Sequence, residues 1–521
     1  MGRYFDSLKR LLTAVGRRIA EPKQRVSTPP AASRPPVPPG AGSSEGAVKG
    51  LEEQAPSPNV QGQVLVKQGG AGRLLQFPRA NPGRPTDIVI GLDFGTSCSK
   101  VVMQSPYTLG GRAIAVPFGE MSHSSTPYLI PTQVFVDKSD SVRLIPTDGA
   151  TAIRHLKVGI LDRLIGGENG SADEFAKDLV ACTIGYLALV LREARGWFLT
   201  SQSETYGNDH IGWSVNLGIP SAGYDDEEMR AEYETLARAA WLASLDDRPL
   251  RMDSIQDALQ RARVDRDCVG IPIEVVPEVA AQVVGYAKSR LREEGLHVLV
   301  DLGASTLDIC SFVLHRQGGD DVYSLLTATV RRLGLLELHR RRMAATRKTP
   351  PFDSTPDDIV AALPSWVSDQ IPSPALRGQL EQCDARFRTE CMRLLCGTIL
   401  DLRQKRDPLS RRWRDGLPVF VCGGGALSGV FRDFLRQAND EATKVWNMKG
   451  LHHRPMPALG LLGADGKPLD PAIFNRVNVA YGLSFPAINI GTIEPPNDIE
   501  DIDPPRRRRR WEDGFVGKEQ V

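Results

Sequence analysis

Residues 88–100 read IVIGLDFGTSCSK: an apolar run ends in Asp93 and a turn of glycine and hydroxyl residues. Residues 297–308, HVLVDLGASTLD, repeat that order around Asp301, and both stretches continue into a second apolar run. A glycine lets the backbone turn tightly beside a phosphate, while hydroxyl and N–H groups point at the phosphate oxygens. The repeated pattern predicts two related halves that face each other across a nucleotide-binding cleft.

The aspartate at the end of each strand predicts a metal site. Mg²⁺ takes few protein ligands and keeps several waters, so we expect Asp93 and Asp301 to hold it through water. A metal between two carboxylates and a triphosphate neutralises charge that builds up during phosphoryl transfer. Lys100 adds a positive charge to the first turn. These residues predict Mg²⁺-dependent chemistry on a nucleoside triphosphate.

Two further segments have the composition of ligand-binding turns. Residues 418–425, PVFVCGGG, place three glycines between a strand and a helix, where they permit a flat backbone against a base and ribose. In residues 274–281, EVVPEVAA, Pro277 suits the first position of a helix and Glu278 suits its first turn. Glu278 is therefore either a favourable helix start or a residue that orients an attacking or metal-bound water.

In their order, these four elements resemble the phosphate-1, connect-1, phosphate-2 and adenosine motifs of the actin-like ATPase superfamily. The DnaK-type heat-shock chaperones are the branch they resemble most. The resemblance covers roughly residues 87–492. It implies an α/β, two-lobed actin-like ATPase fold, built from duplicated ribonuclease-H-like halves with mixed sheets flanked by helices. It also implies ATP or ADP and Mg²⁺ as ligands.

The resemblance assigns roles residue by residue. Asp93 and Asp301 would hold Mg²⁺ through water, and Glu278 would match the connect-1 carboxylate. Lys157 is the candidate for the catalytic lysine of the chaperones, which completes a catalytic set of Asp93, Lys157, Glu278 and Asp301. The remaining nucleotide contacts would be Gly95, Thr96 and Ser97 for the β-phosphate; Gly303, Ala304, Ser305 and Thr306 for the β- and γ-phosphates; and Gly423, Gly424 and Gly425 for the adenosine.

Three departures from the chaperone pattern leave the branch open. Lys100 stands where actins and sugar kinases place a phosphate-binding lysine, which most chaperones lack. Ala304 and Ser305 replace two glycines of the second turn, and a protein that binds nucleotide but barely turns it over is therefore an alternative. The sequence around the three glycines also lacks the arginine that chaperones carry nearby.

Composition and sequence pattern divide the chain into five parts. The globular part has short Val- and Ile-rich strands, at 88–93, 213–220, 297–303 and 418–425, followed by helical stretches. The predicted helices are 172–199, 225–243, 278–294, 379–405 and 427–440. The predicted parts are a basic amphipathic helix (1–20), a Pro/Gly/Ser-rich disordered linker (21–86) with a short strand at 61–69, lobe I (87–295), lobe II with a return to lobe I (296–492), and a disordered charged tail (493–521).

Bulk composition narrows the partners and the compartment. The formal charge of +1 gives no global field for nucleic acid, so a nucleic-acid partner is not expected, and we expect Arg506–Arg510 to be part of a solvated tail. The eight cysteines form no CxxC pair, which favours buried free thiols in a reducing cytoplasm. No apolar run reaches the ~20 residues needed to cross a bilayer. Residues 1–20 predict peripheral membrane contact, docking in a partner's groove, or packing on the protein itself.

Two weaker signals receive plain structural interpretations. His452 and His453 have no third ligand nearby in the sequence, so we expect a polar loop rather than a metal site. The basic run His339-Arg340-Arg341-Arg342 is expected to be a solvated helix end.

The resemblance implies an ATP-binding and ATP-hydrolysing, chaperone-like molecular switch that acts on an unidentified protein partner. No β-rich peptide-binding domain follows the helix expected at 474–482, so a complete DnaK-like chaperone is not expected. Two alternatives remain: a small-molecule kinase of the sugar-kinase type, and a filament-forming actin-like protein.

Overall fold

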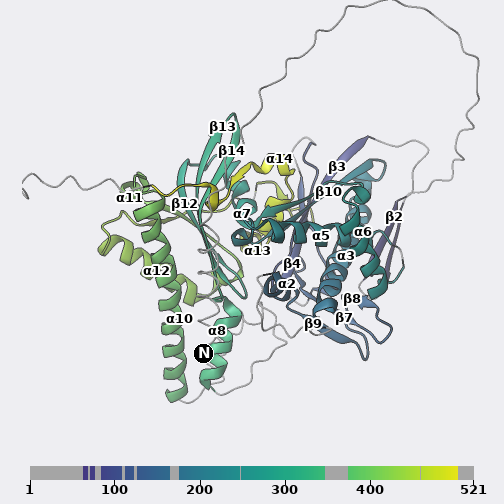
Figure 1. The fold of residues 1–521 in the computed structure, drawn as a ribbon, viewed down its shortest axis with the longest axis horizontal. Helices are drawn as coiled ribbons and strands as arrows, with labels where there is room; N and C mark the ends of the chain where they lie inside the picture. The colour runs from purple at the N-terminus through teal and green to yellow at the C-terminus, as the bar shows by residue number, and fades with distance from the viewer. Residues whose placement is uncertain are drawn as a thin grey trace, which may run out of the picture.

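The computed structural model describes residues 63–68, 71–76, 84–107, 112–122, 126–164, 175–246, 248–346, 374–457 and 459–502 (Figure 1). Its architecture is α/β, with mixed sheets flanked by helices, as predicted. The predicted N-terminal helix and the arginine run at 506–510 lie outside the described residues.

The first large sheet carries the Asp93 turn. Its strand order is β11-β10-β3-β4-β5-β17, with β6 paired to β4. Pairing is antiparallel between β3, β4 and β5, whereas β10 is parallel to β3 and β11 is parallel to β10. The strands are β3 (Pro85–Asp93), β4 (Cys98–Gln104), β5 (Ala113–Ala115), β6 (Ile130–Pro131), β10 (His210–Ile219), β11 (Ile273–Pro277) and β17 (Leu461–Leu462).

The second large sheet carries the Asp301 turn. Its order is β16-β15-β12-β13-β14-β18. Pairing is antiparallel between β12, β13 and β14, whereas β15 is parallel to β12 and β16 is parallel to β15. The strands are β12 (Gly295–Leu302), β13 (Leu307–Gln317), β14 (Asp320–Arg331), β15 (Leu417–Cys422), β16 (Leu451–His453) and β18 (Thr492–Glu494).

The two large sheets have the same topology. Each begins with three consecutive antiparallel strands, and two later strands extend the first of these in parallel. In both sheets the turn after the first strand follows the sequence Asp-x-Gly, at Asp93 and at Asp301. Side chains that follow the ends of neighbouring parallel strands meet at one edge of a sheet, which is where α/β proteins bind ligands. The topology therefore places the two aspartates at corresponding edges.

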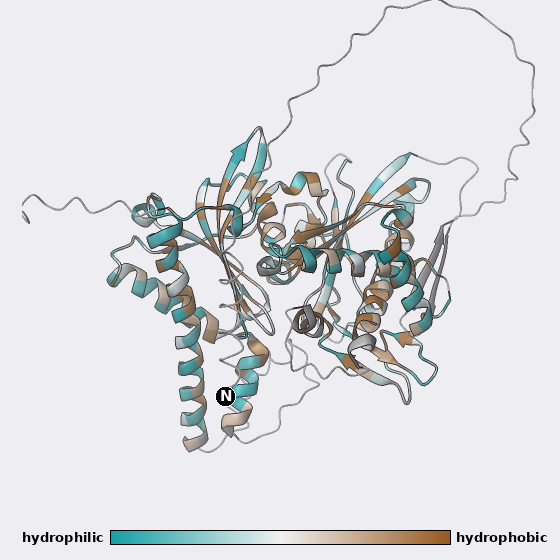
Figure 2. Ribbon diagram, viewed as in Figure 1, coloured by the Kyte–Doolittle hydropathy of each residue, from teal (hydrophilic) through white to brown (hydrophobic). Residues whose placement is uncertain are grey.

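Helices cover the faces of both sheets. In the first half, α3 packs against α5 and α6, and in the second half α10 packs against α8 and α12. Figure 2 shows hydrophobic residues concentrated along α3 and the strands. The helices are α2 (Leu156–Leu164), α3 (Phe175–Ser201), α5 (Glu227–Ser244), α6 (Met252–Val264), α7 (Glu278–Ala287), α8 (Leu335–Thr346), α10 (Pro374–Asp401), α12 (Gly429–Lys444) and α13 (Pro471–Leu483).

Helices α7 and α13 pack directly on each other, and α13 also packs on β3. A Cβ atom on Gly482 of α13 would overlap the backbone of Ala281 in α7, and one on Gly91 of β3 would overlap the backbone of Ala480. Glycine at these positions allows a close approach of backbones. Helix α13 therefore connects β3, which ends at Asp93, with α7, which begins at Glu278.

Three predictions need correction: the disorder of the linker, the end of one helix and the disorder of the tail. Within the predicted linker, β1 (Gln63–Gln68) confirms the expected short strand and pairs with β2 (Ala71–Gln76) as an antiparallel hairpin. The predicted helix 278–294 ends at Ala287, because the Ser289 hydroxyl bonds the Tyr286 carbonyl and accepts from the Leu291 N–H. Within the predicted disordered tail, residues 493–502 are placed, because Glu494 bonds Ser324 and Ile499 bonds Arg406.

Candidate functional site

The first turn is held by an ion pair of its own residues and by a hydrogen bond from Thr132. Asp93 and Lys100 are paired across β3 and β4, and their side chains form an ion pair with Nζ 2.9 Å from Oδ2. A Cβ atom on Gly95 would lie 3.0 Å from that Nζ and would collide with the Cys98 carbonyl. The Thr132 hydroxyl donates to the Gly95 carbonyl at 2.7 Å. Only glycine fits this position, so the turn can bring its backbone close to a ligand.

The second turn has the corresponding form. Asp301 and Asp308 are paired across β12 and β13, where the first turn has Asp93 and Lys100. The Gly303 N–H donates to the Thr306 carbonyl at 2.9 Å, which closes the turn. The Gln282 amide donates to Asp301 Oδ2. An acidic residue thus replaces the lysine of the first turn, and two carboxylates lie side by side.

The three-glycine turn presses against the second turn. Cys422 pairs with Asp301 across β15 and β12. The next residue, Gly423, has φ +81° and ψ 161°, a conformation restricted essentially to glycine. A Cβ atom on Gly423 would lie 2.5 Å from the Leu302 carbonyl oxygen and would collide with Asp301 Oδ1. The glycine is therefore required for this packing, and the turn continues as the short 3₁₀ helix Gly424–Leu427 rather than as a flat surface.

Lys157 and Glu278 meet as a buried ion pair, with Nζ 2.5 Å from Oε1. Lys157 lies in the first turn of α2, and Glu278 begins α7 directly after Pro277. Burial alone would lower the pKa of Lys157, but the charges of Glu278, Tyr233 and Asp93 raise it, with a net increase. Lys157 therefore stays charged and lies within the field of Asp93. The structure brings together these residues, which are far apart in the sequence.

Two carboxyl groups in the second turn have raised pKa values. Burial raises the pKa of Asp301 to about 6, and the charges of Glu278 and Asp93 add to this, while Gln282 and Lys100 oppose it. Burial also raises the pKa of Asp308 to about 8, together with the charges of Asp301 and Glu278, while Thr306 and Lys157 oppose it. Asp308 Oδ1 is buried without a hydrogen-bond partner.

These electrostatic interactions join the two sheets at one site. We call the following six residues the carboxylate cluster: Asp93, Lys100, Lys157, Glu278, Asp301 and Asp308. With Asp308 protonated, as its raised pKa favours at neutral pH, the other three carboxylates exceed the two lysines by one negative charge, and loss of the Asp308 proton would leave two. A divalent cation would balance that charge, and oxygen ligands are those that Mg²⁺ prefers. The cluster therefore fits Mg²⁺.

The cluster does not form an all-protein metal cage. Among the residues that the structure describes, no group of three or more His, Cys, Asp or Glu residues is arranged to hold a metal ion. Mg²⁺ at Asp93 and Asp301 would therefore complete its coordination with water and phosphate oxygens, in line with its ordinary preference.

Sequence reasoning missed several residues that surround the turns. Gln282 lies one helical turn after Glu278, a spacing that the sequence alone could have revealed. The start of α8 bonds to the second turn: the Gly334 N–H donates to the Ser305 carbonyl at 3.1 Å, and the Leu336 N–H donates to the Ala304 carbonyl at 2.8 Å. These backbone bonds depend on tertiary structure, and no sequence signal marks them.

An arginine also lies beside the three-glycine turn. A Cβ atom on Gly424 would be 3.5 Å from Arg476 Nε, and Arg476 belongs to α13. Arg476 is about 50 residues from the three glycines in the sequence, so only the fold brings it beside them.

The two weaker sequence signals have structural explanations. His452 and His453 lie in β16, and a Cβ atom on Gly416 would be 2.5 Å from His452 Nδ1, so His452 packs on that turn. The prediction of a solvated basic helix end is wrong for Arg342, which is buried and donates to Asp384 at 2.7 Å. Arg341 is also paired, with Glu337 and Glu390. This basic run joins α8 to α10.

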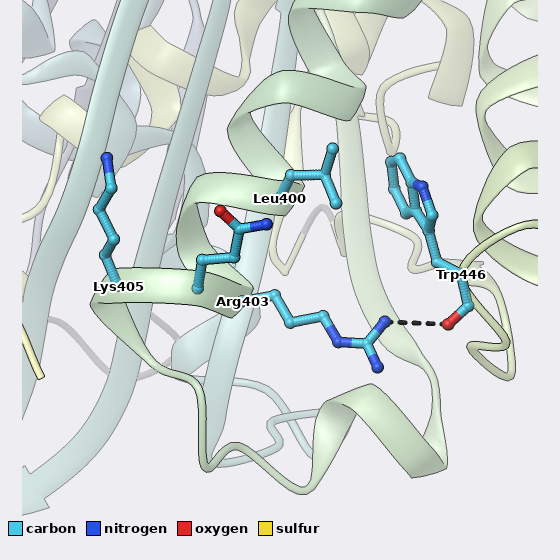
Figure 3. Close-up of a pocket in the computed structure, with 5 residues that line it drawn as sticks. Leu400, Arg403, Lys405 and Trp446 are labelled. Carbon is cyan, nitrogen blue, oxygen red and sulfur yellow. Dashed lines mark hydrogen bonds between the residues drawn. The ribbon is translucent and has the colours of Figure 1, made fainter. Parts of the chain in front are cut away.

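A separate hollow of about 620 Å³ lies at the end of α10, around the π-helical segment Leu402–Arg406 (Figure 3). There Arg403 donates to the Trp446 carbonyl at 2.9 Å. No residue of the carboxylate cluster lines this hollow, so it is not part of the candidate site.

Comparison with known proteins adds no assignment: no protein-family model matches the sequence, and no curated protein matches it.

Among the described residues, none of the helices combines the length and apolarity needed to cross a membrane. The described cysteines are free, and all except the half-buried Cys383 are buried, as the sequence predicted. The carboxylate cluster and the topology around it are therefore the features of this protein that bear on its function.

Proposed function

We propose that this protein is a Mg²⁺-dependent ATPase with a two-lobed, actin-like fold, acting as a chaperone-like switch on a partner protein. The observation that carries the proposal is the carboxylate cluster, in which equivalent turns of two sheets of the same topology meet. A duplicated fold with an Asp-x-Gly turn in each half supports a nucleotide clamped between the halves. We place the protein in the cytoplasm, with residues 1–20 as a contact for a partner or a membrane surface.

The chemistry of the cluster supports phosphoryl transfer to water. When bound, Mg²⁺ would supply positive charge beside the phosphates. Asp93 and Asp301 would hold its water ligands, and Lys157 would add a fixed positive charge at the site. Glu278, held by Lys157 at 2.5 Å, is positioned to accept a hydrogen bond from the attacking water or a metal-bound water. The backbone of both turns would cradle the phosphates.

The connections of the second turn support a switching role. Backbone hydrogen bonds join residues 303–305 directly to the start of α8. Arg342 then joins α8 to α10 through its buried ion pair with Asp384. A ligand that moves the second turn would therefore shift a pair of long helices, which a partner protein can read.

Substitution of a cluster aspartate tests the proposal. We expect Asp301→Asn to reduce Mg²⁺-dependent ATP hydrolysis by about 100-fold or more, because it removes a charge placed at the metal. The matched control is Asp253→Asn, since Asp253 lies in α6 with a side chain that is 72% exposed. Hydrolysis is measured with purified full-length protein, and binding of Mg²⁺-ADP is measured by calorimetry.

Each competing function predicts a different result. Absence of nucleotide binding by the unmodified protein would overturn the proposal. Nucleotide binding with full hydrolysis in Asp301→Asn would overturn the site assignment. Transfer of phosphate to a sugar would favour the kinase, and ATP-dependent light scattering would favour the filament. Identical protease-cleavage patterns with ATP and ADP would contradict switching.

A further inference from the structure

A single residue, His155, joins strand β9 (Thr151–Arg154) to α2, the helix that carries Lys157. Its φ is +58°, a left-handed backbone conformation that residues other than glycine seldom adopt. Such a conformation costs free energy, so it persists only where the surrounding structure imposes it, and it occurs preferentially at functional sites. This strained residue lies two positions before a member of the carboxylate cluster.

The chain is fixed on both sides of His155. Before it, Arg154 is paired with Gln133 of β7 (Gln133–Val136), and Arg154 Nε donates to Gln133 Oε1 at 3.1 Å. After it, the Leu156 side chain is completely buried in the core of the first half. Neither neighbour can turn without losing these contacts, so the change of direction between strand and helix falls on His155.

The orientation of α2 depends on this change of direction. The Gly159 N–H donates to the His155 carbonyl at 3.0 Å, which is the backbone hydrogen bond that begins the helix. Farther along, α2 packs tightly on α3, because a Cβ atom on Gly159 would collide with Leu179 Cδ2. A different φ at position 155 would therefore tilt α2 at its first residue, and Lys157 is the second residue of that helix.

The Lys157 side chain has little room to follow such a tilt. Its Nζ lies 2.5 Å from Glu278 Oε1, and only 7% of the side chain is exposed. His155 itself is exposed. The feature of His155 that bears on Lys157 is therefore its backbone conformation rather than its imidazole.

We propose that His155 is a positioning residue for Lys157. Its left-handed backbone turns the chain from β9 into α2 at the angle that brings the Lys157 ammonium against the Glu278 carboxylate. Histidine is one of the few residues besides glycine that are enriched at positive φ, so the residue type agrees with this role. The effect on the ion pair needs no ligand, whereas the effect on hydrolysis rests on the proposed function.

Substitutions that change the backbone preference test this assignment in the full-length protein. We expect His155→Val to lower kcat for Mg²⁺-dependent ATP hydrolysis by about 10- to 100-fold, because a β-branched residue resists positive φ and a displaced catalytic group has effects of that size. His155→Gly adopts positive φ freely and should keep kcat within about twofold of the unmodified protein.

The reactivity of the Lys157 amine reports on the ion pair without any nucleotide. The pair with Glu278 keeps this amine protonated and buried, so it should react slowly with acetic anhydride. We expect acetylation of Lys157 to be about 10-fold faster in His155→Val, since one pKa unit changes the neutral fraction of an amine tenfold. Mass spectrometry of the peptide that contains Lys157 measures the rate, with the exposed Lys138 as the internal reference.

Asp140→Val is the matched control. Asp140 has the same φ of +58°, but it is exposed and lies in the turn between β7 and β8 (Val142–Arg143). This variant should lose stability toward urea much as His155→Val does, while kcat and Lys157 acetylation stay as in the unmodified protein. Equal effects of the two valine substitutions on Lys157 would show general destabilisation and would overturn the inference.

The outcomes separate this inference from the proposed function. Unchanged Lys157 acetylation in His155→Val overturns the inference and leaves the ATPase intact. A loss in His155→Gly equal to that in His155→Val shows that the imidazole is required, and also overturns the inference. No hydrolysis by the unmodified protein overturns the proposed function, and acetylation then decides the inference alone. If His155→Val does not fold, His155→Ala decides, because it must acetylate faster at Lys157 than His155→Gly.

Discussion

Substitution of Gly423 by alanine would place a methyl group against the second turn. Gly423 has φ +81° and ψ 161°, and a non-glycine residue in that region costs about 1–3 kcal/mol. The added Cβ would also lie 2.5 Å from the Leu302 carbonyl oxygen and would collide with Asp301 Oδ1. Overpacking of this kind costs about 1–3 kcal/mol more. We therefore expect Gly423→Ala to lose about 2–6 kcal/mol of stability.

Gly270→Ala is the matched control for this substitution. Gly270 has φ +68° and ψ 8°, so alanine is strained there too, but a Cβ atom would meet nothing within 4 Å. The left-handed backbone costs about 1–2 kcal/mol, partly offset by the smaller entropy of the unfolded chain. The difference between the two variants therefore measures the collision with the second turn together with any extra backbone cost at Gly423.

Urea unfolding and Mg²⁺-ADP binding together provide the assay. Gly423→Ala should unfold at a clearly lower urea concentration than Gly270→Ala and should bind Mg²⁺-ADP more weakly, because Asp301 must move. Equal urea midpoints for the two variants, with unchanged ADP affinity, would refute the packing of Gly423 on Asp301.

Two pH-dependent effects follow from other residues. Burial lowers the pKa of His297 from 6.5 to about 4, so below pH 6.5 the unfolded chain binds a proton at this residue that the folded protein does not. The folded protein is therefore destabilised as the pH falls from 6.5, by about 3 kcal/mol at pH 4. Urea unfolding at pH 7 and pH 4 measures it, and equal pH dependence in His297→Phe and the unmodified protein would contradict it. Burial raises the pKa of Asp308 to about 8, so Mg²⁺-ADP binding at pH 7 should release close to one proton, and less in Asp308→Asn. Calorimetry in buffers of different ionisation enthalpy tests this, and equal release would rule out Asp308 as the source.

The strands that precede the key turns were predictable from local sequence. The apolar runs at 88–93, 213–220, 297–303 and 418–425 correspond to β3, β10, β12 and β15. Buried strands are Val- and Ile-rich runs, and a glycine follows closely after the ends of β3, β12 and β15, whereas Pro220 follows β10. The helix at 278–294 was predicted too long because its end depends on the hydroxyl of Ser289, which hydrogen-bonds the backbone around it.

By itself, the sequence determined which chemical groups stand at each turn. Asp93, Gly95 and Lys100 are neighbours along the chain, so their types and order are visible without a fold. The same holds for the Asp301 turn and for the three glycines. Such information is local, because a turn is defined by the dihedral angles of a few consecutive residues.

Only the tertiary structure decided which turns share one site. The raised pKa values of Asp301 and Asp308, the 2.5 Å ion pair of Lys157 with Glu278, and the approach of Arg476 to Gly424 all join residues from different elements. Electrostatic energy and burial depend on distance in space, and distance in space is set by the packing of α7, α13 and the two sheets. The sequence therefore shows which chemical groups are present, but their ionisation and their partners depend on long-range packing.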